Sequence, residues 1–177
     1  MKELTAVLTE ATRSIDAAYF HLNIDGGDAI YRERVYCYEL YHQMRNQWPR
    51  ESPFYLNGEI DKSAHPILTE LGAAHAKPDL LVHMPGYMDG NYAIIEVKSP
   101  RASLREIKID LDKLAIFVNR VGYRRAIYLH YGYDNDGVVK RVAEISSLME
   151  GLPSIELWLH SNVGEPAEMV LQLKGKN

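Results

Sequence analysis

The sequence predicts a single α/β domain, with a mixed central sheet flanked by helices and an extra helix at the N-terminus. Its 177 residues are 46% hydrophobic and 25% charged, which is enough for one substantial core and too little for two. Helix-like and strand-like apolar patterns alternate in the order helix, helix, three strands, helix, strand, helix, strand. No repeat or low-complexity linker divides residues 1–177, so we expect one folding unit.

Two helices are expected before the first strand. Apolar residues recur at helical spacing over residues 3–19, and the IDGGD segment at 24–28 interrupts this pattern. Asp28 is a suitable N-cap for a second helix that runs to about Trp48, where Pro49 stops it.

Three strands are expected next, at residues 54–60, 79–84 and 92–98. Each is a short, largely apolar run, and the PGYMDGN segment that joins the last two is rich in turn residues. These two strands should therefore form a hairpin.

The segment after Lys98 predicts the second half of the sheet. Ser103 and Glu106 have the spacing of a capping box, and the apolar spacing after them predicts a helix that ends near Gly122. The remaining elements expected are a strand, a helix and a final strand, at residues 124–131, 138–150 and 155–160. The polar, glycine-containing last residues are expected to fray.

The overall charge argues against binding nucleic acid through a global electrostatic field. The net charge is −4 and the pI is near 6.0, so such binding would need a local basic patch. Basic residues gather in three places, each of which could equally be a solvated surface of mixed charge: Arg32, Arg34 and Arg45; Arg101, Arg105 and Lys108; and Arg120, Arg124 and Arg125.

The N-terminal residues and the cysteine content predict a soluble, cytoplasmic protein that does not enter the membrane. The first residues include Glu, Thr and Asp where a signal peptide needs an unbroken apolar core, and no run approaches the roughly 20 apolar residues of a membrane span. Cys37 is the only cysteine, which excludes an internal disulfide and a cysteine-built zinc site.

Charged side chains occupy both strands of the predicted hairpin. Period-two alternation places Glu96 and Lys98 on the same face. If the hairpin is centred between Tyr87 and Met88, Asp79 lies directly across from Glu96, with Cβ atoms about 4.5 to 5.5 Å apart. Two carboxylates and an ammonium group would then converge at one end of the hairpin.

Such a group of charges indicates a metal site. Two carboxylates this close repel each other unless a cation lies between them, and hard oxygen ligands suit Mg²⁺ or Mn²⁺. Lys98 could orient or deprotonate a water, or neutralise charge that develops on a phosphate. This combination indicates hydrolysis of phosphodiester bonds. The alternative is an ion pair of Lys98 with Glu96 or Asp79 at the edge of the sheet.

The spacing of these residues resembles that of the PD-(D/E)xK nuclease superfamily, also called restriction-endonuclease-like. The Pro-Asp pair that ends at Asp79 is followed, after sixteen residues, by the Glu-Val-Lys segment at 96–98. The superfamily core resembles αβββαβ, and the elements expected over residues 28–131 follow that order. Both halves of the motif also lie on predicted strands joined by a turn.

The resemblance implies roles for individual residues. Asp79 and Glu96 would be metal ligands, the main-chain carbonyl of Val97 would be a further ligand, and Lys98 would be the catalytic lysine.

Many superfamily members also use an acidic residue from the helix before the sheet. Glu39 is favoured for that catalytic role here, with Glu33 as the other candidate on the same helix. Glu59, on the first predicted strand, is a rival and a possible metal ligand, and Asp61 points the same way by alternation. The alternative for both acids is an ion pair with Lys62 or a solvated position.

Other polar residues near the motif have two possible uses. Asp110 and Lys113 flank the apolar stripe of the helix after the motif, where they either support the site or face solvent. The histidines lack the spacing of a helical zinc pair, so we expect polar roles or phosphate contacts for His65, His75 and His83. Tyrosines could stack on bases, although packing in the core or at an interface is favoured for Tyr31, Tyr36, Tyr38 and Tyr41.

The activity expected from the motif is that of a Mg²⁺-dependent nuclease acting on nucleic acid, with DNA favoured as substrate. The alternative is a nuclease-fold binding or assembly module without catalysis, against which the intact set of Asp79, Glu96 and Lys98 argues. A hydrolase for a small phosphate ester is a third reading, without a Gly-rich phosphate loop to support it. A homodimer is expected, with the second helix or residues 152–160 as its interface.

Overall fold

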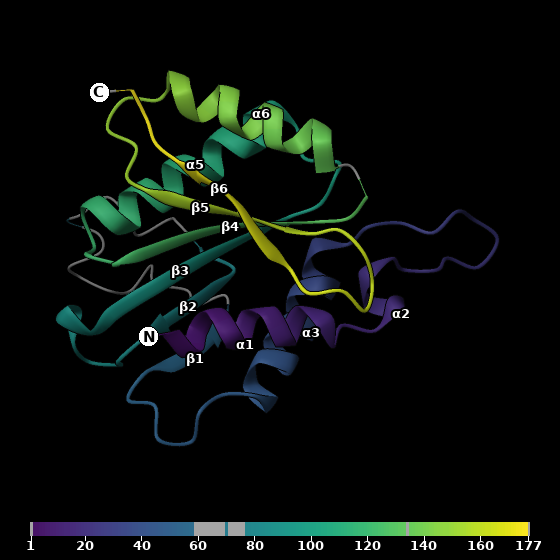
Figure 1. Ribbon diagram of the computed structural model, residues 1–177, viewed down its shortest axis with the longest axis horizontal. Helices are drawn as coiled ribbons and strands as arrows, with labels where there is room; N and C mark the ends of the chain where they lie inside the picture. The colour runs from purple at the N-terminus through teal and green to yellow at the C-terminus, as the bar shows by residue number, and fades with distance from the viewer. Residues whose placement is uncertain (1, 59–69, 71–76, 134, 177) are drawn as a thin grey trace.

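The computed structural model describes residues 2–58, 70, 77–133 and 135–176. In this part of the chain one six-stranded sheet lies between two layers of helices (Figure 1). The strands are β1 (Tyr55–Gly58), β2 (Leu80–His83), β3 (Asn91–Lys98), β4 (Arg125–Tyr131), β5 (Ile155–His160) and β6 (Glu168–Leu173). They lie side by side in chain order. β3, β4 and β5 are parallel and the other pairs antiparallel, so the predicted α/β class with a mixed sheet is confirmed.

The helices divide between the two faces of the sheet. One layer contains α1 (Lys2–Arg13), α2 (Ala17–Phe20) and α3 (Glu33–Asn46), and the other contains α5 (Leu104–Asn119) and α6 (Asn135–Leu148) (Figure 1). Alternation along β3 sends Ile95 and Val97 into the core with α1 and α3, and Ile94 into the core with α5 and α6. Glu96 follows the alternation of Ile94 and therefore lies beneath α5.

The hairpin of β2 and β3 has the predicted register at its open end. Leu80 pairs with Ile95 and Leu81 with Ile94. The same register, continued by one residue beyond Leu80, places Asp79 beside Glu96. The ladder shifts near His83, where a short 3-10 helix (Met88–Gly90) forms part of the turn.

The two N-terminal helices differ from their predicted bounds. The first is wrong in length, because α1 ends at Arg13 and Asp16 caps the separate helix α2 by accepting a hydrogen bond from the amide of Ala18 at 2.8 Å. The second begins at Glu33 and not after Asp28. An isolated antiparallel bridge between Leu22 and Ile30 keeps the chain extended there.

The C-terminal residues contain a strand that was not predicted. β6 pairs antiparallel with β5, so β5 is an interior strand. Every residue of β5 except Glu156 is buried, so β5 offers little exposed surface to the dimer interface suggested for residues 152–160.

None of the described helices has the length and apolar character of a membrane span.

Candidate active site

Six charged side chains meet where β2 begins and β3 ends. They come from four elements or their ends: Glu33 on α3, Asp79 before β2, Glu96 and Lys98 on β3, and Asp110 and Lys113 on α5. We call these six residues the charged cluster.

Asp79 is held at the end of β3 by a main-chain hydrogen bond. Its Oδ2 accepts from the amide of Val97 at 2.8 Å. Burial raises the pKa of the Asp79 carboxyl, and the Val97 amide and the ammonium groups of Lys113 and Lys98 only partly oppose this rise. The neutral form of Asp79 is therefore favoured more strongly than in an exposed aspartate.

Glu96 is the most deeply buried acid of the cluster, with a side chain 1% exposed. Its Oε2 lies 2.7 Å from Nζ of Lys113, while its buried Oε1 has no hydrogen-bond partner within the described residues. Burial and the nearby Asp79 raise the pKa of Glu96 well above its usual range, despite Lys113. An additional cation would favour the ionised form of both carboxyls.

Lys98 lies between two acids from opposite layers of the fold. Its Nζ is 3.1 Å from Oε2 of Glu33 and 3.2 Å from Oδ2 of Asp110. Burial lowers the pKa of Lys98, but Asp110 and Glu33 outweigh it, so the net pKa lies above the usual lysine value. Lys98 is consequently an ammonium ion at neutral pH.

Glu33 is the acid that α3 brings to the cluster. Its Oε1 accepts hydrogen bonds from the amide of Ser99 at 3.3 Å and from the Ser99 hydroxyl at 3.0 Å. The Glu33 carboxylate therefore binds both Lys98 and Ser99. Glu39 lies further along α3, where it accepts a 2.6 Å hydrogen bond from Gln43. The geometry thus favours Glu33 as the acid that this helix contributes to the site, whereas the sequence favoured Glu39.

Asp110 and Lys113 belong to the cluster and are not merely surface charges. Asp110 is 4% exposed, and its Oδ1 lies 3.3 Å from Nζ of Lys113. A signal for this was present in the sequence, because Asp110 occupies the apolar stripe of α5 between Ile107 and Leu111. Ser99, which adjoins Lys98, carried no comparable signal.

The charge balance of the cluster fits one divalent cation. Among the described residues, four carboxylates face two ammonium groups, so these six side chains carry a net charge of −2 when all four acids ionise. The described residues contain no group of three or more His, Cys, Asp or Glu side chains arranged to hold a metal. Asp79, Glu96 and the Val97 carbonyl would suffice for Mg²⁺, which is often held by one or two carboxylates and keeps several waters.

The remaining candidate residues are either not described or lie away from the charged cluster. Glu59, Asp61, His65 and His75 lie outside the described residues. His83 is at the opposite end of β2 from Asp79, with Nε2 2.8 Å from Oδ1 of Asn57.

A cavity of about 370 Å³ adjoins Asp79 between α3 and the ends of β1 and β2. Its lining includes Cys37, Tyr41 and Asn57 together with the 61% exposed Tyr38. Tyr38 therefore borders solvent instead of packing in the core, whereas Tyr36 is fully buried as expected.

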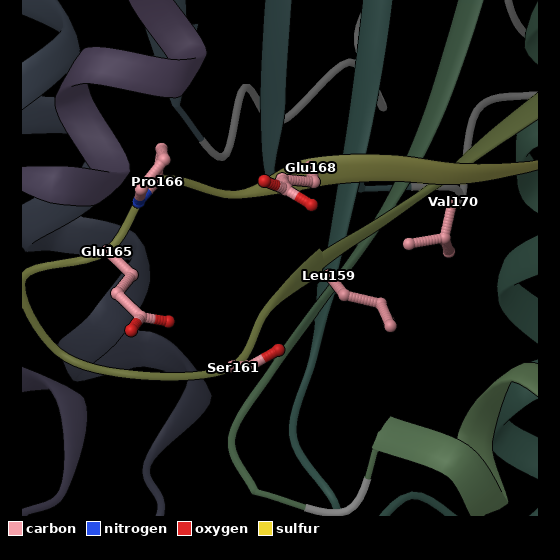
Figure 2. A pocket seen from close by; sticks show the side chains of 6 residues that line it. All are labelled: Leu159, Ser161, Glu165, Pro166, Glu168 and Val170. Atoms are coloured by element: carbon pink, nitrogen blue, oxygen red, sulfur yellow. The ribbon is translucent and has the colours of Figure 1, made fainter.

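A second cavity, of about 220 Å³, lies where β5 passes into β6. Figure 2 shows Glu165 on the connecting loop and Glu168 at the start of β6, with Leu159 and Ser161 across from them. Glu165 already accepts a hydrogen bond from Asn162 at 2.8 Å, and none of the described lining residues belongs to the charged cluster.

Comparison of the chain with protein-family models, with curated proteins and with solved structures found no match in any of the three.

Proposed function

We propose that this protein is a metal-dependent phosphodiesterase that hydrolyses nucleic acid, with DNA as the favoured substrate. The observation that carries the proposal is the convergence of Asp79 and Glu96, both with raised carboxyl pKa values, beside the paired ammonium group of Lys98. Among the described elements, the chain order α3, β1, β2, β3, α5, β4 is also the αβββαβ order that the resemblance to the PD-(D/E)xK superfamily implies.

Asp79, Glu96 and the Val97 carbonyl would hold the cation. Mg²⁺ or Mn²⁺ bound there would act as a Lewis acid on a phosphate oxygen and lower the pKa of a bound water.

Lys98 is proposed to stabilise negative charge on the phosphate. Because the carboxylates of Asp110 and Glu33 stabilise the ammonium form of Lys98, this lysine is a poor base at neutral pH and a good hydrogen-bond donor. Of the roles open to this lysine from the sequence, orientation of water and neutralisation of charge are thus favoured over deprotonation. Glu33 is a positioning residue that fixes the ammonium group through its bonds to Lys98 and Ser99.

The proposal is tested by incubating the purified protein with single-stranded, duplex and branched DNA and with RNA, in Mg²⁺, Mn²⁺ or EDTA. We expect cleavage only with metal, and a loss of at least about 100-fold in Lys98→Ala. Lys140→Ala is a matched control, because Lys140 is exposed on α6, where its Nζ lies 3.9 Å from Oε1 of Glu144, and it belongs to none of the basic groups named from the sequence. Wild-type activity in Lys98→Ala, or no metal-dependent cleavage of any substrate, would refute the proposal.

A further inference from the structure

Three partly exposed aromatic rings lie together at the end of the sheet beyond Lys98. The rings of His21 and Tyr31 are stacked, with centroids 4.4 Å apart and an interplanar angle of 28°. Tyr133 meets both rings edge-on, at centroid distances of 6.3 Å from Tyr31 and 6.4 Å from His21. We call His21, Tyr31 and Tyr133 the aromatic platform.

The main chain fixes the stacked pair in place. Leu22 and Ile30 exchange two hydrogen bonds, of 2.9 and 2.8 Å, and so close the base of the loop between them. His21 and Tyr31 flank this bridge on its two strands, which sets their rings against each other. The buried ring of Phe20 supports the platform from below, 6.3 Å from Tyr31 and 5.8 Å from Tyr133.

The platform adjoins the charged cluster through the ends of β3 and β4. Gly132, directly after β4, has a φ of +116°, and a Cβ at this position would lie 2.5 Å from Cγ of Pro100 and 3.1 Å from Cε1 of Tyr31. Only glycine lets the chain approach this closely. Pro100 is two residues beyond Lys98, so the platform begins beside the strand end that carries the lysine. α2, which ends directly before His21, lies on the side of the molecule where β3 and β4 end (Figure 1).

The exposed surface around the platform combines rings with positive charge. Tyr133 is 60% exposed, and His21 and Tyr31 are half-buried. Arg32 and Arg101, which follow Tyr31 and Pro100 in the chain, are both exposed. Burial raises the pKa of the Tyr31 hydroxyl, and a main-chain hydrogen bond to Tyr133 and the positive charge of Arg101 partly oppose this rise.

We propose that the aromatic platform binds an unpaired base of single-stranded nucleic acid, with Arg32 and Arg101 against the neighbouring phosphates. Bases stack on aromatic side chains irrespective of their sequence, and positive residues follow the backbone of the strand. A duplex cannot present a base in this way, because its bases are stacked on one another. The proposal rests on the proposed function, since the phosphodiester bond at the charged cluster and the stacked base belong to one strand.

The test is the affinity of the full chain for fluorescein-labelled single-stranded DNA and RNA and for a duplex of the same sequence, measured by fluorescence anisotropy in EDTA. We expect wild type to bind a single strand more tightly than the duplex. Tyr133→Ala should weaken single-strand binding between about 5-fold and about 150-fold, the loss of one stacked base, and Tyr133→Phe should restore most of it. Tyr87→Ala is the matched control, because Tyr87 is 65% exposed at the opposite end of the β2–β3 hairpin and should bind as wild type does.

The same assay separates failure of the platform from failure of the proposed function. Single-strand binding that depends on Tyr133 supports the platform even if no metal-dependent cleavage is found. Single-strand affinity that is unchanged in both Tyr133→Ala and Tyr31→Ala overturns the platform even if cleavage depends on Lys98. Equal weakening in Tyr87→Ala would also overturn it.

Discussion

Lys98 and Glu33 form an ion pair, with Nζ 3.1 Å from Oε2, that joins the end of β3 to the first turn of α3. The same carboxylate also accepts hydrogen bonds from the amide and hydroxyl of Ser99. A helix that precedes the sheet in the chain thus fixes the position of the lysine on which the proposed chemistry depends.

Glu33→Gln should lower the rate of nucleic-acid cleavage by about 10- to 100-fold, the range seen when a partner that orients site residues is removed. The amide keeps the shape but loses the charge that fixes Lys98. Glu39→Gln, on the same helix, should cleave within about twofold of wild type, because Glu39 bonds Gln43. Single-turnover rates for the two variants measure this difference. An equal loss of cleavage rate in both variants would show that Glu39 contributes as much to the site as Glu33.

Lys113→Met removes the ammonium group that neutralises Glu96. Because a buried carboxylate without its partner is costly, we expect the free energy of unfolding in EDTA at pH 7 to fall by about 3 kcal/mol. A divalent cation would replace the missing charge, so Mn²⁺ should raise the Tm of this variant more than that of wild type. A rise no larger than in wild type would argue against Glu96 as a metal ligand.

Lys108→Met serves as the control for Lys113→Met on the same helix. Lys108 and Asp112 form an ion pair with side chains 59% and 48% exposed, so its loss should change stability by less than about 1 kcal/mol. Its response to Mn²⁺ should match that of wild type.

His160 should make the folded protein sensitive to acid. Burial lowers the pKa of His160 to about 4, against about 6.5 in the unfolded chain. The unfolded chain therefore binds more protons between these values, so stability is lost as pH falls from about 6.5 to about 4, by about 3 kcal/mol in all. The free energy of unfolding, measured by urea denaturation across this pH range, should depend less on pH in His160→Gln than in wild type. An equal pH dependence in the two proteins would contradict the lowered pKa of His160.

The thiol of Cys37 should be nearly inert in the folded protein. It is 6% exposed, and burial, followed by the carboxylates of Asp79 and Glu33, raises its pKa well above the usual value. Reaction with a disulfide reagent at pH 8 should be at least about 100-fold slower than for free cysteine and should become fast in denaturant. Rapid reaction of the native protein would show that the thiol is accessible.

The part of the site on the hairpin could be predicted from the sequence. The turn-rich PGYMDGN segment and the alternation along residues 92–98 define a register, and the pairing of Leu80 with Ile95 is the one expected. Such local signals determine which side chains face each other across two strands.

The sequence could not show which of the two candidate acids of α3 lies beside Lys98, because the start of this helix depends on tertiary structure. Arg32 provides no side-chain cap, and the bridge between Leu22 and Ile30 that delays the helix is not encoded in a short pattern. β6 was missed for a similar reason. Met169 and Val170 are adjacent and both exposed, so the strand lacks clear alternation and forms by pairing with β5.

Calorimetric titration of Mn²⁺ into metal-free protein measures whether Asp79 and Glu96 together hold one divalent cation. We expect one site in wild type, binding weakened by at least about tenfold in Asp79→Asn and in Glu96→Gln, and unchanged binding in the exposed turn variant Asp89→Asn. Wild-type Mn²⁺ affinity in both Asp79→Asn and Glu96→Gln would contradict the account.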